Sequence, residues 1–431
     1  MAAVAAAGFA IRVGYILAFE NPYRPASDAL YYSGGGRLLA AGYGFIDWPA
    51  FGLTLGRLQL QSAFHPPAYT VFLALPSLLG LKTVLEQQIA TAALGTATVV
   101  VIGLLARRIA GRRAGLIAAA FAAVYPNVWF SDVFLMSESL SLLAIAVALL
   151  LTYRCMARPN LAIMASLGLV CGIATLSRAE TVFLAPLLGL SLLLLLHGVA
   201  WKRRLSLVSV LALATVATIA PWIIYNHTRF ERPVYLTTGF GNLLDTSNCD
   251  RTYSGPRLGS YYGYCQLRTL PREESQAEYL ERKRAVNYIS EHLDRVSIVA
   301  LARVGRSWGL YRPLQVIRLD HIEPQEPREL PAAWLGLVMY YGLAVTSIAG
   351  VIVLRRRNIS TLPLLAPLLL VTLVAIATNG QTRYRASAEV SLVVLSAVAI
   401  GRPSRPQERA GAASQLNGDG REPNGSWAGG S

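Results

Sequence analysis

A small set of polar side chains stands at the ends of long apolar stretches, and these side chains could do chemistry together. The set comprises Asp28, His65, Asp132, Glu138, Arg178, Glu180, Asn226 and the run Arg383-Tyr384-Arg385. A carboxylate can take a proton from a hydroxyl group, and a guanidinium binds phosphate oxygens through several fixed N–H donors. For any single residue, the simpler interpretation is that helix ends are polar. As a group, these residues suggest a site for an anionic ligand.

The composition indicates where such a site would lie. Of the 431 residues, 54% are hydrophobic and 15% are charged, whereas a soluble domain carries about 25% charged residues. Several apolar stretches exceed the roughly 18 residues that mark a membrane-spanning helix. A barrel strand would alternate apolar and polar residues, and these stretches are apolar all round. The sequence therefore predicts an all-α polytopic membrane protein and excludes a soluble globular domain.

Clusters of basic residues set the predicted topology. The net charge of +15 could suggest a nucleic-acid partner, but many basic residues fall in short clusters between apolar segments, at 107–113, 154–158, 202–204 and 355–357. Such clusters are typical of cytoplasmic loops. Placing them inside predicts ten transmembrane helices with both termini in the cytoplasm, at about 3–19, 85–106, 114–131, 138–153, 160–176, 181–197, 205–225, 333–354, 359–378 and 386–401.

These spans divide the chain into four regions. We expect spans one to seven in 1–226 with a first outer loop at 20–84, a long extracytoplasmic loop at 227–332, spans eight to ten in 333–401, and a disordered cytoplasmic tail at 402–431. Residues 66–80 are apolar but too short to span, so they predict a helix in the outer interface. Arg12 lies midway along the first span and must find a partner there. No cleavable signal peptide is expected, and residues preceding Met1 are left as an open alternative.

Three arginines lie on the outer side in this topology. Arg178, Arg383 and Arg385 occupy very short outer loops, against the tendency of basic residues to stay inside. Cations held there indicate an anionic ligand, such as a phosphate at the outer leaflet. We therefore treat these three residues as candidate phosphate ligands, with structural anchoring as the alternative.

The order of several short motifs resembles the GT-C glycosyltransferases. Asp28 followed by Tyr32, Gly36, Leu39 and Gly42 resembles the first outer loop of that superfamily. The stretch His65-Pro66-Pro67-Ala68-Tyr69, the phrase Ala220-Pro221-Trp222-Ile223-Ile224-Tyr225-Asn226 and the ending Arg383-Tyr384-Arg385 also occur there. Within the superfamily, the chain is most similar to the bacterial group resembling protein O-mannosyltransferases, the aminoarabinose transferase of lipid A and rhizobial lipopolysaccharide galacturonosyltransferases. The resemblance covers most of residues 10–400.

The resemblance implies a GT-C type fold, with interfacial helices in the first outer loop and one long outer loop. It implies transfer of a hexosyl or pentosyl group from a polyprenyl-phosphate-linked sugar to an envelope acceptor (a glycolipid, polysaccharide or protein) at the outer face of the inner membrane. A phosphate is a good leaving group, so this reaction needs a carboxylate base and cations, without the acid that a glycosidase adds. Membrane lipids are expected partners, and nucleic acid is not.

The resemblance also suggests roles for the remaining candidates. Asp28 is the expected catalytic base, with a helix cap as the alternative. His65 stands where relatives place a basic phosphate contact, and its charge depends on its local pKa. Glu138, or Asp132 in its place, is expected to orient the acceptor or to hold a divalent cation. The sequence contains no metal-binding His/Cys arrangement, and no other cofactor is expected.

The long outer loop contains two cysteines, Cys249 and Cys265. In an oxidising compartment we expect them to form a disulfide, which would contribute roughly 3 kcal/mol, with two free thiols as the alternative. Further along the loop, residues 275–305 predict a helix that is amphipathic at first and more apolar toward Trp308.

A secondary transporter or lipid-linked-sugar flippase is the main alternative function. Transporters tend to place ionisable residues near the bilayer midplane and to show repeated halves, whereas here the polar residues lie at outer helix ends and the halves differ in their loops. An envelope polysaccharide polymerase or ligase and a noncatalytic scaffold are further alternatives. A scaffold would not need arginines in short outer loops, so the sequence favours the transferase.

Overall fold

The computed structural model describes residues 1–20, 25–266, 269–322 and 328–401. In these ranges the ordered elements are helices, with one isolated bridge between Ile46 and Gln61. Among the described residues, five helices are long and apolar enough to cross a membrane, or six when one bent pair counts as a span, and shorter apolar helices accompany them. The expected all-helical, multi-pass architecture is therefore confirmed. The predicted tail, 402–431, lies outside the described residues.

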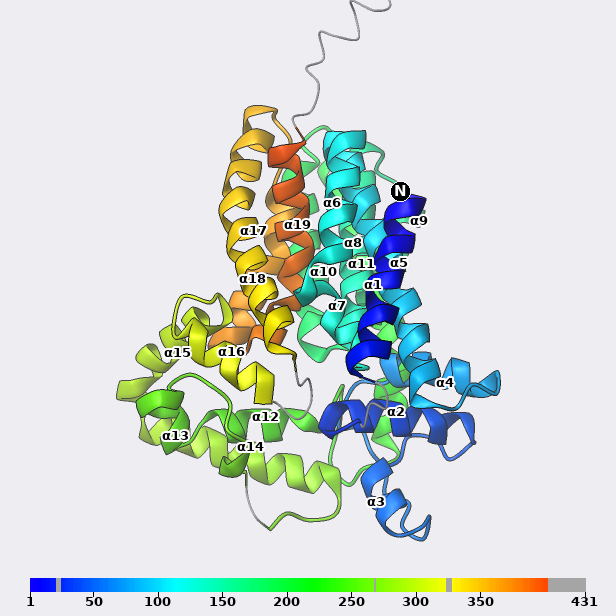
Figure 1. Ribbon diagram of the computed structural model, residues 1–431, viewed down its shortest axis with the longest axis vertical. Helices are drawn as coiled ribbons and strands as arrows, with labels where there is room; N and C mark the ends of the chain where they lie inside the picture. The colour runs from blue at the N-terminus through cyan, green and yellow to red at the C-terminus, as the bar shows by residue number, and fades with distance from the viewer. Residues whose placement is uncertain (21–24, 267–268, 323–327, 402–431) are drawn as a thin grey trace, which may run out of the picture.

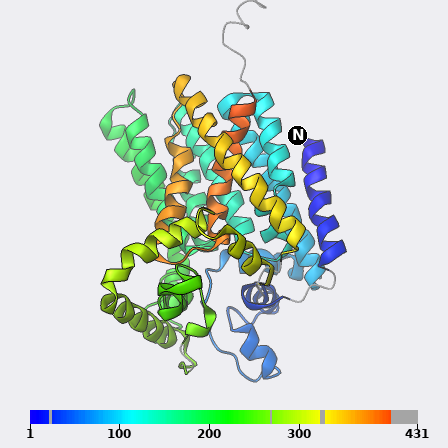
Figure 2. The same cartoon turned by 60° about the vertical axis from the view of Figure 1, so that its left-hand side comes forward.

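Two layers make up the molecule, a tall bundle and a lower layer of shorter helices (Figure 1). The bundle consists of α1 (Ala2–Phe19), α5 (Val84–Ala110), α6 (Arg112–Val124), α7 (Pro126–Val133), α8 (Glu138–Ala157), α9 (Leu161–Ser177), α10 (Leu184–Leu195), α11 (Trp201–His227), α17 (Leu330–Arg356), α18 (Leu362–Ala377) and α19 (Ala386–Ile400). The turned view in Figure 2 shows α17 crossing the bundle at a slant.

The lower layer comes from two separate parts of the chain. The first outer loop supplies α2 (Ser27–Ala40), α3 (Trp48–Leu53) and α4 (Ala68–Leu78), and the long loop supplies α12 (Gly239–Ser247), α13 (Asp250–Tyr253), α14 (Glu274–Glu291), α15 (Leu293–Ser307) and α16 (Pro313–Ile322). Short 3-10 helices join them or end the bundle helices: η1 (Ala179–Phe183), η2 (Gly255–Arg257), η3 (Gly263–Cys265) and η4 (Thr382–Arg385).

Local sequence explains where several helices begin, end or bend. Thr83 and Glu86 form a reciprocal capping box at the start of α5, and Gly111 (φ 90°) ends it. The span predicted at 114–131 is broken into α6 and α7, which are bent by 49°. Pro126 explains this correction, because it lacks an N–H group and forces Tyr125 into an extended conformation. The helix predicted at 275–305 is likewise two helices, since the backbone leaves helical geometry at His292.

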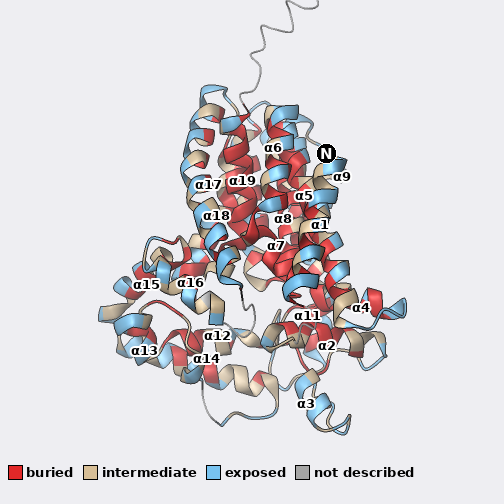
Figure 3. Cartoon of the chain, in the orientation of Figure 1, coloured by how far each residue is buried: buried red, intermediate tan, exposed pale blue. Residues whose placement is uncertain are grey.

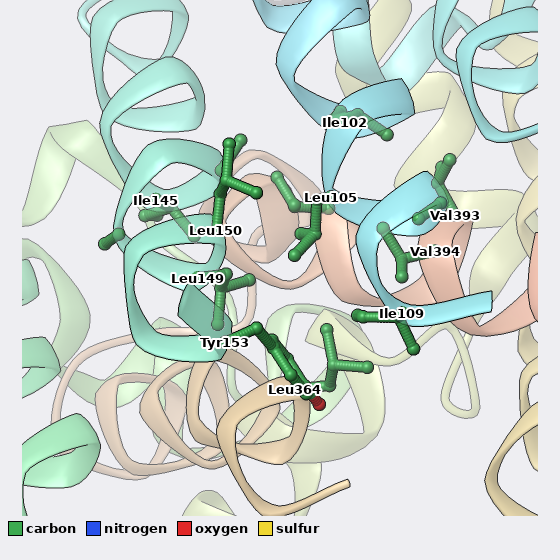
Figure 4. Packing of buried hydrophobic residues seen from close by; sticks show 14 of the residues in the cluster. Ile102, Leu105, Ile109, Ile145, Leu149, Leu150, Tyr153, Leu364, Val393 and Val394 are labelled. Atoms are coloured by element: carbon green, nitrogen blue, oxygen red, sulfur yellow. The ribbon is translucent and has the colours of Figure 1, made fainter. Parts of the chain in front are cut away.

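The core lies in the middle of the bundle. Buried residues concentrate on the inner faces of its helices, whereas α17 is exposed along its outer side (Figure 3). Ile102 of α5, Leu149 of α8 and Leu364 of α18 belong to one large buried cluster that also includes residues of α19 (Figure 4). Lipid tails are as apolar as leucine, so close van der Waals packing stabilises such a bundle more than removal of apolar surface from water.

A buried ion pair joins α1 to α7. Arg12 is fully buried, and its Nε donates to Asp132 Oδ2 at 2.7 Å while Nη1 donates to the Gly8 carbonyl at 3.0 Å. Gly95 of α5 lies beside the pair, where a Cβ atom would collide with the Asp132 carboxylate. Asp132 is thus the partner that Arg12 was expected to need.

The short helix expected at 66–80 is present as α4, which lies below the bundle beside α2 (Figure 1), and its place in the membrane interface stays a prediction. Their backbones approach closely at Gly36, where an added Cβ would come within 3.0 Å of Leu73. Tyr32 and Tyr69 are buried in the same small cluster. This packing holds α2 under the lower ends of the bundle helices.

Candidate functional site

Asp28 lies in the first turn of α2. The first turn is where unpaired N–H groups and the helix dipole favour a negative charge. The N-cap residue of this helix is Ala26, and no side chain caps the helix start. Asp28 therefore does not act as the helix cap that the sequence left as an alternative. Its side chain is 14% exposed and makes two ion pairs, described below, that reach other elements. Asp28 is therefore a partly accessible carboxylate held at the junction of the two layers.

His65 approaches Asp28 from the segment preceding α4. Its Nε2 atom lies 3.3 Å from Asp28 Oδ1. The ring is stacked on Tyr32, with centroids 4.8 Å apart, and its edge meets Tyr31 at 5.1 Å. Aromatic contacts on two sides hold the imidazole beside the carboxylate.

Arg383 connects Asp28 to a second carboxylate. From η4, its Nη1 donates to Asp28 Oδ2 at 3.0 Å and its Nε donates to Glu138 Oε1 at 2.9 Å. Glu138, in the first turn of α8, also forms an ion pair with Arg178, which in turn pairs with Glu180. Among the described residues, Glu138 Oε2 is buried without a hydrogen-bond partner. One buried carboxylate oxygen therefore lacks a hydrogen-bond partner among the described residues.

The aromatic ring of Tyr384 lies beside both arginines of this network. The Arg178 and Arg383 guanidinium carbons lie 5.2 and 6.0 Å from the ring centroid. The ring face attracts cations and excludes water, which strengthens the nearby ion pairs. Beyond its position between two arginines, no feature of the sequence indicated this role for Tyr384.

Arg385 lies apart from this network, although it is only two residues from Arg383. Its Nε donates to Glu389 at 2.7 Å, its Nη1 donates to the Ser307 carbonyl at 3.1 Å, and its guanidinium covers the ring of Tyr340. The structure thus brings together Asp28, His65, Glu138, Arg178 and Arg383, and leaves Arg385 on a different side of η4.

The other sequence candidates also lie elsewhere. Asp132 pairs with Arg12, so it does not take the place of Glu138. Asn226 is fully buried at the end of α11, where its Oδ1 accepts from Arg229 at 3.1 Å. Cys249 and Cys265 are joined in a disulfide, with Cα atoms 6.3 Å apart, in the long loop.

Charge neighbours control the ionisation of Asp28. Burial alone would raise the pKa of this carboxyl, but His65 and Arg383 together hold it below its usual range. Asp28 is therefore ionised at neutral pH. Burial and the Asp28 charge raise the pKa of the Tyr32 phenol, so that Tyr32 stays neutral and can donate a hydrogen bond. The site combines an ionised carboxylate with cations at its edge.

The fit of a divalent cation can be judged from the donor set. Among residues 1–20, 25–266, 269–322 and 328–401, no three His, Cys, Asp or Glu side chains gather in a cluster suited to a metal ion. Hard cations prefer several oxygen ligands, and Glu138 Oε2 is one such oxygen without a protein partner. A cation at Glu138 stays a prediction, and the remaining ligands would come from water or substrate.

One family model matches part of the sequence. A family model described as dolichyl-phosphate-mannose-protein mannosyltransferase matches residues 64–225, which include His65, Glu138 and Arg178. Among curated proteins, none matches the sequence of this chain.

Two solved structures share the fold, and a third is similar at a lower TM-score. The apo oligosaccharyltransferase of Archaeoglobus fulgidus is 15% identical with a TM-score of 0.53, and the match covers 98% of this chain and 52% of that one. The same organism's oligosaccharyltransferase AglB, in complex with an inhibitory peptide and a dolichol-phosphate, is 13% identical with a TM-score of 0.52, covering 97% and 52%. ArnT from Cupriavidus metallidurans, bound to undecaprenyl phosphate, is 16% identical with a TM-score of 0.45, covering 96% and 79%.

The chain spans about half the length of the oligosaccharyltransferase structures. The GT-C resemblance inferred from the outer-loop motifs is confirmed by these comparisons. Over residues 64–225 the chain matches the sequence model of the dolichyl-phosphate-mannose-protein mannosyltransferase family, and its multi-pass membrane fold is similar to that of the Archaeoglobus fulgidus oligosaccharyltransferases.

Proposed function

We propose that this protein is a glycosyltransferase that moves a sugar from a polyprenyl-phosphate donor to an envelope acceptor. The observation that carries the proposal is the network in which Arg383 bridges Asp28 and Glu138 at the junction of the bundle and the lower layer. This network supplies a base and cations in one partly accessible place. The family match over residues 64–225 supports a lipid-phosphate sugar as donor.

In the proposed reaction, the acceptor hydroxyl oxygen attacks C1 of the donor sugar. The bond from C1 to the phosphate oxygen breaks, and polyprenyl phosphate leaves with that bonding pair. Asp28 takes the proton of the acceptor hydroxyl, which increases the nucleophilicity of its oxygen. Arg383, with Arg178 behind it, stabilises the charge that develops on the departing phosphate.

The ion pair between Arg383 and Asp28 gives this mechanism an order. While Arg383 holds Asp28, the low pKa of the carboxyl makes it a weak base. A donor phosphate that binds Arg383 competes with Asp28 for the same guanidinium. Asp28 then becomes more basic when the donor is in place. It can therefore take the acceptor proton when the donor is bound, and it is a weak base when the donor is absent.

Glu138 is proposed to position the acceptor. Its Oε1 forms ion pairs with Arg178 and Arg383. Its unpartnered Oε2 suits a second acceptor hydroxyl or a bound divalent cation. A cation there would supply positive charge near the departing phosphate. Adding EDTA to the transfer assay, then restoring Mg²⁺ or Mn²⁺, distinguishes the two uses of Glu138.

The proposed membrane arrangement keeps ten spans and places the lower layer outside the inner membrane. Support comes from the basic residues at the ends of α5 and α17 away from the lower layer. Positive residues stay on the cytoplasmic side. The shorter helices α9, α10, α18 and α19 run within the bundle beside the long ones, which supports counting them as spans (Figure 1).

A transporter or lipid-linked-sugar flippase would use the same residues differently. It would bind the lipid-linked sugar and move it without breaking the bond to phosphate. Asp28 lies in the first turn of α2 and Glu138 in the first turn of α8, so both carboxylates are at helix ends and not midway along a span, which favours the enzyme. Release of polyprenyl phosphate is therefore the measurement that separates the two functions.

The test is Asp28→Asn in proteoliposomes supplied with a radiolabelled polyprenyl-phosphate hexose and an envelope glycolipid extract. The amide keeps the size of the carboxylate but cannot take a proton, so transfer should fall by about 10²–10⁴-fold. Donor binding should be retained or become tighter, because Asp28 no longer competes for Arg383, and thermal stability should change little.

Asp47→Asn is the matched control, because Asp47 is another outer-loop carboxylate at a helix start and caps α3 through the Ala50 N–H. This variant should transfer at the wild-type rate. A folded Asp28→Asn protein that transfers sugar as fast as Asp47→Asn would remove Asp28 from the mechanism.

A further inference from the structure

A second group of arginines surrounds a pocket where the bundle meets α16. Its walls include Arg306 of α15, Arg328, Ala333 and Leu337 of α17, and Thr382 and Arg385 of η4. Asp28, His65, Glu138 and Arg178 are not among its lining residues. It is therefore a different place from the candidate catalytic site.

Positive charge dominates this pocket. All three arginine side chains are at least nine-tenths buried. Arg306 donates to the Leu258 and Pro256 carbonyls and to Gln315 Oε1, which are neutral oxygens that leave its charge in place. Arg385 pairs with one carboxylate, that of Glu389. Burial lowers the pKa of Arg306 to about 10, as expected for a guanidinium removed from water.

Two buried hydrogen-bond donors of the pocket have no partner among the described residues. They are Nη2 of Arg385, whose side chain is 1% exposed, and Oγ1 of Thr382. An unsatisfied buried donor costs about 1–3 kcal/mol, and more when it is charged. Both donors belong to residues that line the pocket, so an anion bound there would satisfy them.

The pocket adjoins a surface suited to lipid chains. On α17, Trp334, Leu335 and Val338 alternate with the pocket residues Ala333 and Leu337, and they are 45%, 50% and 64% exposed. An apolar face beside buried arginines matches a molecule with an anionic head and acyl chains. A free phosphate would use the arginines but make no contact with this face.

We propose that the pocket between α15, α16, α17 and η4 binds the phosphate headgroup of a membrane lipid that is distinct from the sugar donor. The donor phosphate is linked to C1 through one oxygen, so a donor reacting at Asp28 must hold its phosphate beside Asp28. The arginines of this pocket then bind a second phosphate, carried by a surrounding phospholipid. This binding goes beyond the proposed transfer and does not require it.

The experiment is native mass spectrometry of the purified full chain with added lipids. Phosphatidic acid should bind at least tenfold more tightly than diacylglycerol, which has the same chains without phosphate. Saturating undecaprenyl phosphate should bind in addition to phosphatidic acid, giving a doubly loaded species. Inorganic phosphate should bind weakly, because it cannot use the apolar face of α17.

Two variants test the residues. Thr382→Val removes one unpartnered donor and should weaken phosphatidic acid binding several-fold. Val316→Asp places a carboxylate in the pocket wall on α16, where it should pair with the arginines, preserve thermal stability and weaken binding by at least tenfold. Arg312→Gln is the matched control, because Arg312 is exposed and does not line the pocket, and it should bind phosphatidic acid as the wild type does.

Three results would overturn the inference. They are one-for-one displacement of phosphatidic acid by undecaprenyl phosphate, inorganic phosphate binding as tightly as phosphatidic acid, and a folded Val316→Asp protein that binds phosphatidic acid like Arg312→Gln. The first result would show that the donor phosphate binds in this pocket. The second would show that the ligand need not be a lipid, and the third that the lipid does not bind in this pocket.

Discussion

Arg383 is the residue on which the proposed chemistry depends most, because one guanidinium serves two carboxylates. It holds Asp28 through Nη1 and Glu138 through Nε, and it is 14% exposed, so a substrate phosphate can reach it. Arg178 is more deeply buried and lies between Glu138 and Glu180. Arg383 is therefore the better candidate for direct contact with phosphate, and Arg178 for holding Glu138.

Loss of the Arg383 charge should shift the pH dependence of transfer. Arg383 and His65 both lower the pKa of Asp28 against the effect of burial, so removing one cation lets that pKa rise. Transfer needs ionised Asp28 and therefore declines as pH falls through its pKa. In Arg383→Gln the decline should begin at higher pH than in the wild type, and kcat/KM should also fall.

Arg383→Lys keeps a positive charge and is the matched control for this effect. Its acid limb should stay close to that of the wild type, although its rate should drop because lysine cannot form the same fork of hydrogen bonds. The measurement is the transfer rate of each variant as a function of pH, from neutral pH into the acid range. Identical acid limbs in the Gln and Lys variants would contradict the role assigned to Arg383.

Among the elements, α17 and α19 depend on one glycine for their contact. A Cβ atom on Gly350 of α17 would collide with the backbone of Leu395 in α19, which cannot turn away as a side chain could. Gly342 lies two turns earlier on α17 and has nothing within 4 Å of its Cβ position. The two glycines thus differ in packing while sharing one helix.

Gly350→Ala should therefore destabilise the protein, by about 1–3 kcal/mol for an overpacked contact. Gly342→Ala should be neutral or stabilising by up to about 1 kcal/mol, because alanine favours the helix. Thermal unfolding in detergent of both variants gives the comparison. Equal midpoints for the two proteins would show that α17 and α19 do not pack as described.

The disulfide acts on the long loop as an element. Cys249 precedes α13 and Cys265 ends η3, so the bond closes the turn between them. We expect mass mapping without reduction to find the linked peptide in protein from the native membrane. Cys249→Ser should lower stability by roughly 3 kcal/mol on the loop-entropy estimate.

Cys155 and Cys171 are buried in the bundle and serve as internal controls, since they should appear as free thiols after unfolding. Finding all four cysteines as thiols would refute the expected bond. Finding Cys249 and Cys265 paired only after oxidation during purification would have the same meaning.

At the scale of the whole molecule, the orientation in the membrane is the main prediction. Cysteines introduced at Leu53 and Leu293 should react with a membrane-impermeant maleimide added outside, because both positions are highly exposed in the lower layer. Cysteines at Arg112 and Arg356 are also exposed but lie at the other end of the bundle. They should react only after the membrane is opened.

Because all four positions are exposed, a difference in labelling reports the side of the membrane and not burial. Labelling of Arg112→Cys from outside, with Leu53→Cys protected, would invert the topology. It would also place Asp28 and Arg383 in the cytoplasm, and the proposed donor would then have to be used on the inner face.

The amino-acid sequence by itself determined the class of fold and most helices. Apolar length and clustered arginines are local properties, so the helices expected at 3–19, 85–106 and 138–153 correspond to α1, α5 and α8 with small differences at their ends. The break at Pro126 was also encoded locally, and the span predicted at 114–131 overlooked it.

Only the tertiary structure decided which charges meet. Arg12 and Asp132 are 120 positions apart, and Asp28 and Arg383 are 355 apart. The predicted topology placed most of the catalytic candidates at one end of the bundle. It could not predict which of them form ion pairs. Arg383 and Arg385 illustrate the reason: two residues on one short 3-10 helix point to different neighbours, and the packing of α2, α8, α15 and α19 around it settles which side chain each arginine contacts.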